Sequence, residues 1–282
     1  MDYRKVKISI CQYQIGTNKK NNISKADKYI RESMKDNPNI IVLPECFVCP
    51  YDINVFKKNS ECVLESFNDK DSPATYMLYK CSRDYPNVYI FGGSIIEKEI
   101  KENGDIFLYN TCLVFHNGKL IKKYRKVNLY KIQIDEHSFC EGDILNSGNK
   151  PTIVNTIYGK IGLGICYDVR FNDLAKYYQE AGCKMIIYPG SFNRFTGPKH
   201  WLVLQQARAL DNQLFVISCS AACNFGSSYE SYGKSYIISP WGSIVSETKL
   251  DKEEILSSLI NLSEITEIRR KLPILSYVNV EI

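Results

Sequence analysis

The chain lacks the sequence features of membrane proteins and of nucleic-acid-binding proteins. None of its 282 residues falls in an apolar window long enough to span a bilayer, and the N-terminal MDYRKVKISICQYQ has no uninterrupted apolar stretch of signal-peptide length. The formal net charge is only +5, whereas nucleic-acid-binding domains usually cluster many basic residues. We therefore expect no membrane segment and no nucleic acid as the main partner.

A disulfide framework is also missing, although cysteine is common. The eleven cysteines have no regular spacing, and several stand inside apolar runs, as Cys112 and Cys219 do. A reduced cysteine in such a run behaves as a small buried hydrophobic residue. These features favour a reducing, cytoplasmic location, with import into an organelle left open.

The chain has no internal repeat, no low-complexity tract and no linker rich in Pro, Gly or Ser, so we expect a single domain over residues 1–282. Strand patterns alternate with helical ones, and the wholly apolar run at 39–44 is typical of a buried strand. Asn117-Gly118 between two strand patterns predicts a type I′ hairpin. The longest segment without a clear pattern is 130–150. This mixture predicts a layered α/β fold with mixed sheets.

Cys166 stands where a cysteine can become reactive. It ends the glycine-containing strand pattern KIGLGIC and precedes a predicted helix that starts near residue 171. The N-terminus of a helix carries partial positive charge, which lowers the pKa of a thiol. An arbitrary cysteine at a strand end is more often a buried filler, so its assignment as a nucleophile depends on its partners.

Two charged residues at other strand ends are candidate partners. Glu45 follows the apolar run NIIVLP, and α/β proteins place functional groups beyond the carboxyl ends of such strands. Apolar surroundings would raise the pKa of this carboxyl group and suit it as a base near neutral pH. Lys126 closes the basic run KKYRK and could stabilise an oxyanion in a partly dry site. Taken singly, Glu45 could equally be a helix cap or an ion-pair partner, and Lys126 a surface residue.

Histidine and metal alternatives have less support. The chain has only three histidines, of which His200, at the start of a predicted helix, could pair with a thiolate. Cys46 and Cys49 have the spacing of zinc ligands, but no second Cys/His pair with comparable spacing completes a set of four. We therefore expect no metal site.

The three motifs together resemble the nitrilase-type carbon–nitrogen hydrolase family. In that family a Glu, a Lys and a Cys follow in this order at strand ends, and here they stand in LPECF (Glu45), YRKVNLY (Lys126) and GLGICYDVRF (Cys166). The resemblance extends from about residue 5 to about residue 275. It implies an α/β fold, a four-layer α-β-β-α sandwich of two mixed β-sheets flanked by helices. It also implies catalysis by these residues without a metal or organic cofactor, and a homo-oligomer, at least a dimer.

The family often has a second glutamate between the lysine and the cysteine, ahead of a Pro-Gly-Asp turn. The corresponding turn here reads Glu141-Gly142-Asp143, without the proline, and the segment before it is shortened. Glu136 is the best match to this further catalytic residue, with Asp135 and Glu141 as alternatives.

Among the branches of the family, the chain is most similar to the ω-amidases, through CYDVRF, YPGSFN, TGPKHW and ARALDNQ. This resemblance implies hydrolysis of the terminal amide of 2-oxoglutaramate or 2-oxosuccinamate, through a cysteine thioester, to the 2-oxo diacid and ammonia. The alternative substrates are deaminated glutathione and other small amides. The carboxylate and keto groups of such a substrate need polar or basic contacts, for which Arg170, Asn193, Thr196 and His200 are candidates, although Arg170 could equally be a structural ion-pair partner.

Three residues near the expected pocket depart from the family pattern. Val48 and Asp52 replace an Asn and a Gly in the loop after Glu45, and Asn128 replaces a His after the lysine. These departures bear on the substrate rather than on the type of reaction.

Overall fold

Two mixed β-sheets form the centre of the structure, a computed structural model that describes residues 3–63, 67–68, 70–134, 137–227 and 229–276. The first sheet has the order β15-β1-β2-β3-β5-β4, with β6 paired to β5, and β1, β2 and β3 run parallel at its centre. Its strands are β1 (Lys5–Gln12), β2 (Ile40–Val42), β3 (Tyr89–Phe91), β4 (Ile95–Ile100), β5 (Ile106–His116), β6 (Lys119–Arg125) and β15 (Glu254–Asn261).

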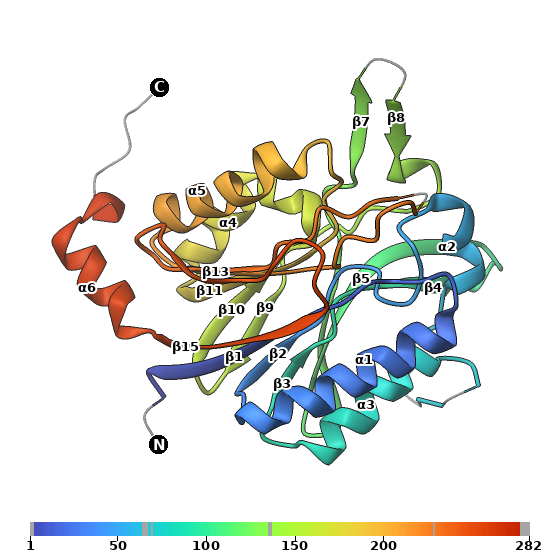
Figure 1. Cartoon of the computed structure of the whole chain (residues 1–282), viewed down its shortest axis with the longest axis horizontal. Coiled ribbons are helices and arrows are strands. Elements are labelled where there is room, and N and C mark those ends of the chain that lie inside the picture. Colours follow the sequence, from blue (N-terminus) through green and yellow to red (C-terminus); the bar gives the residue numbers. More distant parts are fainter. Residues whose placement is uncertain (1–2, 64–66, 69, 135–136, 228, 277–282) are drawn as a thin grey trace.

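The second sheet has the order β14-β13-β12-β11-β10-β9, again with three parallel strands, β10, β11 and β12, at its centre. Its strands are β9 (Ile153–Thr156), β10 (Gly159–Leu163), β11 (Cys183–Gly190), β12 (Phe215–Ser220), β13 (Tyr236–Ile238) and β14 (Ile244–Glu247). A separate hairpin of β7 (Lys131–Ile134) and β8 (His137–Cys140) stands out from the body of the molecule (Figure 1).

Helices cover the outer faces of both sheets, as Figure 1 shows, with α1 and α3 below the first sheet and α4 and α5 above the second. The helices are α1 (Lys19–Ser33), α2 (Ile53–Asn59), α3 (Pro73–Asp84), α4 (Asn172–Glu180), α5 (Leu202–Asn212) and α6 (Ser263–Lys271). The predicted four-layer sandwich of two mixed sheets flanked by helices is therefore confirmed. In the described ranges no helix is long and apolar enough to cross a membrane.

Apolar side chains on both faces of the central strands hold the layers together. One buried cluster joins the two sheets, with Ile10 and Val42 from the first and Leu163 and Ile187 from the second. Another lies between the first sheet and its helices, and includes Ile30 of α1. Strands buried on both faces carry continuous apolar runs, which is why the run at 39–44 was readable as a strand.

Two local features position the end of β6, which Lys126 follows, and the end of β10, which leads to Cys166. Asn117 and Gly118 both have positive φ, 50° and 66°, as the predicted type I′ turn requires, so β6 leads back along β5 to Lys126. In β10, a Cβ on Gly162 would lie 2.4 Å from the Tyr178 ring, so the glycine lets α4 pack directly on the strand that leads to Cys166.

The segment 130–150, which has no clear pattern in the sequence, contains the β7–β8 hairpin and a 3₁₀ turn over Glu141–Asp143. The two strands are only four residues long each, too short for their pattern to separate a strand from a loop. The hairpin returns the chain toward the end of β6.

Candidate active site

Three strand ends bring Glu45, Lys126 and Cys166 together. Glu45 follows β2, Lys126 directly follows β6, and Cys166 opens a 3₁₀ turn after β10. The Lys126 Nζ lies 3.1 Å from Glu45 Oε1, and all three side chains are buried. Glu45 and Cys166 are close enough for each to shift the pKa of the other. The first sheet thus supplies the charged pair and the second sheet the thiol.

A second carboxylate, Glu141, completes the charged cluster. Its Oε2 lies 2.9 Å from Lys126 Nζ, and the side chain is fully buried. The Tyr51 hydroxyl donates to Glu141 Oε1, and the Tyr130 backbone N–H donates to Oε2. Glu136, the residue expected from the resemblance, lies outside the described residues, as does Asp135. Among the described residues, two carboxylates contact Lys126. One is Glu45, and the other is Glu141, which the sequence offered as an alternative to Glu136.

The charge states in this cluster follow from its burial. Burial opposes the charged form of Lys126, but the carboxylates of Glu141 and Glu45 outweigh it and raise the pKa of the ammonium well above its usual value. Burial also raises the pKa of Glu45, although Lys126 acts against this shift. Asn110 donates to Glu45 Oε1 over 2.9 Å, whereas Oε2 has no hydrogen-bond partner among the described residues. This free oxygen leaves Glu45 an acceptor position for a proton.

The thiol of Cys166 is held neutral at rest. Burial, followed by the charge of Glu45, raises its pKa well above the usual value, although Lys126 and the backbone N–H of Ser191 favour the thiolate. The Ser191 N–H points at the sulfur from 3.5 Å. A thiolate here therefore requires that a proton leave the sulfur, and Glu45 is the base beside it.

Backbone strain and a buried carboxylate shape the turn that carries the nucleophile. Cys166 has φ of 48°, a left-handed conformation that is costly for a non-glycine residue and is often found at functional sites. Asp168 accepts four hydrogen bonds, from the Ile165 N–H, the Tyr124 hydroxyl, and both the backbone and side-chain N–H of Asn128. This one carboxylate thus fastens the Cys166 turn to the segment just after Lys126.

A narrow space beside Cys166 collects most of the expected substrate-contacting residues. Arg170, Asn193 and Thr196 line it with Cys166. Its volume is about 10 Å³, close to the minimum that holds one water molecule. Asn193 Oδ1 accepts from the Thr196 backbone and hydroxyl, which fixes this part of the wall.

Arg170 is a cation without a carboxylate partner among the described residues. Its guanidinium lies 5.4 Å from the Tyr167 ring centroid and 5.1 Å from that of Phe192. Its Nη2 is 3.1 Å from His200 Nδ1, and its buried Nε has no hydrogen-bond partner in the described chain. His200 does not line the space beside Cys166. Burial, and after it the charges of Arg170 and Lys199, lower the pKa of His200, so its neutral ring accepts from Arg170.

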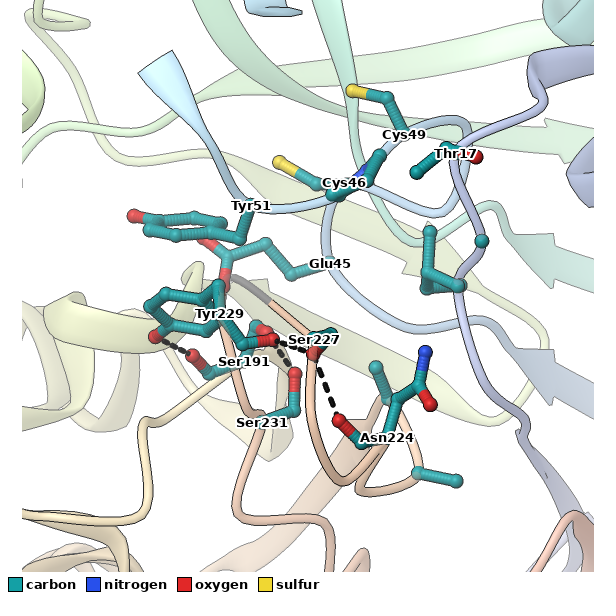
Figure 2. Close-up of a pocket in the computed structure, with 15 residues that line it drawn as sticks. Thr17, Glu45, Cys46, Cys49, Tyr51, Ser191, Asn224, Ser227, Tyr229 and Ser231 are labelled. Carbon is teal, nitrogen blue, oxygen red and sulfur yellow. Dashed lines mark hydrogen bonds between the residues drawn. The ribbon is translucent and has the colours of Figure 1, made fainter. Parts of the chain in front are cut away.

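A larger cavity of about 310 Å³ adjoins this space, and we call it the serine-lined cavity (Figure 2). Tyr51, Ser191 and Tyr229 line both spaces. Glu45 lines the serine-lined cavity, and Figure 2 shows its side chain running toward the Tyr51 and Tyr229 rings. The remaining lining residues include Ala222, Asn224, Ser227 and Ser231.

The loop departures noted in the sequence act as structural residues. Val48 is fully buried and its carbonyl accepts from Asn22, while Asp52 caps the start of α2 by accepting from the Asn54 N–H. Neither residue lines the two spaces at the site. Asn128, by contrast, is linked to the active site, because its backbone and side-chain N–H groups donate to Asp168, which also accepts from the Cys166 turn. In the part of the chain that the structure describes, no group of three or more His, Cys, Asp or Glu side chains is arranged to hold a metal ion.

Comparison with known proteins decides the family. A model of the family described as carbon-nitrogen hydrolase matches residues 7–270. The chain belongs to this family. This hydrolase is 39% identical over 272 residues to "Omega-amidase NIT2" of Mus musculus, covering 95% of this chain and 93% of that protein. It is 38% identical to "Omega-amidase NIT2-A" of Xenopus laevis, also over 272 residues, covering 96% and 94%.

A solved structure agrees with this assignment. Nit3 of Saccharomyces cerevisiae, a member of branch 10 of the nitrilase superfamily, matches with a TM-score of 0.85 and 36% identity, covering 96% of this chain and 95% of that one. The chain is therefore a nitrilase-superfamily hydrolase of carbon–nitrogen bonds and a homologue of ω-amidases.

The raised pKa of the Cys166 thiol predicts how the substrate-free protein reacts with iodoacetamide. Alkylation of Cys166 should be slow at neutral pH and should still accelerate above the usual thiol pKa of about 8.5, because thiolate is the reactive species. Mass spectrometry of the peptide that contains Cys166 measures the rate, and the same peptide in urea gives the reference profile. A rate that is already constant below about pH 8.5 would contradict the neutral resting thiol.

Proposed function

We propose that the chain is an ω-amidase, which hydrolyses the terminal amide of 2-oxoglutaramate or 2-oxosuccinamate to the 2-oxo diacid and ammonia. The observation that carries the reaction type is the buried Glu45–Lys126–Glu141 cluster beside Cys166. Arg170, beside the same thiol and without a carboxylate partner among the described residues, supports a carboxylate-bearing substrate. The similarity to the two ω-amidases supports the same choice.

The reaction begins with proton transfer from Cys166 to Glu45. Burial raises the pKa of Glu45 and so makes its carboxylate a stronger base, and the thiolate that forms beside the Lys126 ammonium attacks the amide carbon. The Lys126 ammonium stabilises the oxyanion of the tetrahedral intermediate. One such donor typically contributes about 3–4 kcal/mol, roughly a hundred- to a thousandfold in rate.

The intermediate then collapses to a thioester. Glu45 returns the proton to the leaving nitrogen, ammonia departs, and the acyl group stays on the Cys166 sulfur. A water molecule that gives its proton to Glu45 attacks the thioester, releases the acid and restores the thiol. Every proton in the cycle passes through one carboxyl group, which fits the free Oε2 of Glu45.

Positioning of Lys126 falls to Glu141 in this scheme. Its Oε2 lies 2.9 Å from the ammonium, and Glu141 is itself fixed by the Tyr51 hydroxyl and the Tyr130 N–H. Glu141 therefore takes the role for which the resemblance favoured Glu136.

The substrate contacts divide the four expected residues into two kinds. Arg170 binds the distal carboxylate, because its Nε and its guanidinium face have no competing anion among the described residues. Asn193 and Thr196 shape the wall beside the acyl chain. His200 acts indirectly, by accepting a hydrogen bond from Arg170 and holding the guanidinium in place.

A homodimer is part of the proposal. Val203, Leu210 and Trp241 expose about half of their surface, at 57%, 46% and 56%, on and beside the outer face of α5. Exposed apolar side chains that gather on one face are typical of protein–protein contacts. The cytoplasmic location remains a prediction from the sequence.

Ammonia release from 2-oxoglutaramate tests this function. The wild-type protein should turn the substrate over and Cys166→Ala should not. Arg170→Met should lower kcat/KM for 2-oxoglutaramate by about 10- to 150-fold, because a hydrogen bond to a charged group contributes about 1.5–3 kcal/mol. Hydrolysis of an uncharged amide such as butyramide should change little in the same variant.

Arg194→Met serves as the matched control, since Arg194 is paired with Glu230 at the surface. It should leave both activities close to those of the wild type. Equal losses for both amides in Arg170→Met would give Arg170 a structural role instead. A wild-type protein that ignores both 2-oxo amides and hydrolyses deaminated glutathione would move the substrate assignment to that branch.

The choice between the two glutamates is tested by paired variants. Glu141→Gln should lower kcat by about a hundredfold or more, because the amide leaves Lys126 with a single carboxylate and misplaces the oxyanion donor. Glu136→Gln should keep near wild-type kcat. The opposite pattern, a large loss confined to Glu136→Gln, would return the role to Glu136.

A further inference from the structure

The serine-lined cavity is larger than the proposed reaction needs. Its volume is about 310 Å³, whereas a departing ammonia molecule is about the size of a water molecule, which a cavity of roughly 10–15 Å³ can hold. The cavity nevertheless reaches Glu45, the residue that delivers the proton to the leaving nitrogen. A primary amide therefore leaves most of this space unused.

The position of Glu45 assigns the two spaces to the two ends of the substrate. The leaving nitrogen must lie within hydrogen-bond reach of its general acid. Glu45 lines the serine-lined cavity, whereas Cys166 and Arg170 line the narrow space. The acyl chain with its carboxylate thus lies on the Arg170 side, and a substituent on the nitrogen would point into the serine-lined cavity.

The cavity lining combines apolar residues, among them Ile15, Pro50 and Ala222, with hydroxyl and amide groups, which suits a small uncharged substituent with a polar end. The hydroxyls of Ser191 and Ser231 are 2.7 Å apart, and Ser227 adds a third hydroxyl, as Figure 2 shows. Asn224 also lines the cavity, and Glu45 is the one charged residue among its described lining residues. A carboxylate in this cavity would lie beside Glu45, whose cluster with Lys126 and Glu141 holds two carboxylates against one ammonium.

We infer that the serine-lined cavity is a leaving-amine subsite, and that this hydrolase accepts terminal amides whose nitrogen carries a small, uncharged, hydroxylated substituent. The inference rests on the proposed function. In the first step the Cys166 sulfur forms a bond to the acyl carbon, the carbon–nitrogen bond breaks, and the proton taken by Glu45 goes to the departing amine. Water then cleaves the thioester, so the products are the 2-oxo diacid and a primary amine.

Three amides of 2-oxoglutarate test the subsite: the primary amide, the N-(2-hydroxyethyl) amide and the N-(carboxymethyl) amide. The kcat/KM of the wild-type protein for the hydroxyethyl amide should be within about tenfold of that for the primary amide. The carboxymethyl amide should be at least about tenfold poorer than the hydroxyethyl amide, a difference of about 1.4 kcal/mol, because its charge faces Glu45. Formation of 2-oxoglutarate is measured in all three cases.

Cavity-filling variants separate the subsite from general effects. Ala222→Leu places a larger side chain in the cavity wall, so the ratio of hydroxyethyl-amide to primary-amide kcat/KM should fall at least tenfold. Ala181→Leu, the same change at the end of α4 and away from the cavity, should leave this ratio unchanged. Asn224→Leu, at a half-buried position that tolerates exchange more readily, should lower the same ratio because it replaces a polar side chain of the cavity wall with a larger apolar one.

The outcomes distinguish the two proposals. Turnover of the primary amide without turnover of the hydroxyethyl amide would overturn the subsite and leave the proposed function intact. An unchanged ratio in both Ala222→Leu and Asn224→Leu would also overturn it. Failure of the wild-type protein on the primary amide itself would overturn the proposed function, and the subsite assignment with it.

Discussion

The active-site architecture depends on an ammonium group buried between two carboxylates. Lys126 is fully buried, as are Glu45 and Glu141, and its Nζ lies 3.1 Å and 2.9 Å from their oxygens. Desolvating such charges is costly, and removing one member of a buried ion pair typically destabilises a protein by about 3–5 kcal/mol. The cluster is favourable only as a complete set, which ties together the end of β2, the end of β6 and the turn after β8.

This arrangement explains why two sheets are needed. The first sheet and the turn after the β7–β8 hairpin provide the cluster of one ammonium and two carboxylates, and the second sheet presents the sulfur to it at the strained Cys166 turn. Asp168 fixes the distance between them, because it accepts hydrogen bonds from both the Cys166 turn and Asn128. The raised pKa keeps the Cys166 thiol protonated in the substrate-free protein. Because thiolate is the reactive form of cysteine, this slows side reactions at Cys166.

The fold and the grouping of Glu45, Lys126 and Cys166 could be predicted from the sequence because their three motifs, each at the end of a patterned strand, together resemble one family. An apolar run precedes Glu45, an Asn-Gly hairpin leads to Lys126, and a glycine-rich strand leads to Cys166. Glu141 could not be separated from Glu136 in this way. The choice depends on where two four-residue strands begin and end, and such short patterns carry too little information.

Side-chain contacts between segments far apart in the chain could not be predicted from the sequence either. Arg170 and His200 are thirty residues apart and were both expected to contact substrate, yet the structure pairs them with each other. Tyr51 and Asn110, which position Glu141 and Glu45, gave no signal in the sequence, because a tyrosine or an asparagine inside a strand or loop is ordinary. Their roles follow from the packing of the two sheets, which brings residues far apart in the chain to one point.

The central claim is that the acyl group passes through a thioester on Cys166, and partitioning with hydroxylamine tests it most directly. The protein is given 2-oxoglutaramate and, separately, an activated ester of the same acid, each with the same concentration of hydroxylamine. A shared thioester predicts the same ratio of hydroxamate to 2-oxoglutarate from both substrates, and no hydroxamate with Cys166→Ala. Full turnover of the amide with no hydroxamate, or different ratios from the two substrates, would contradict the account.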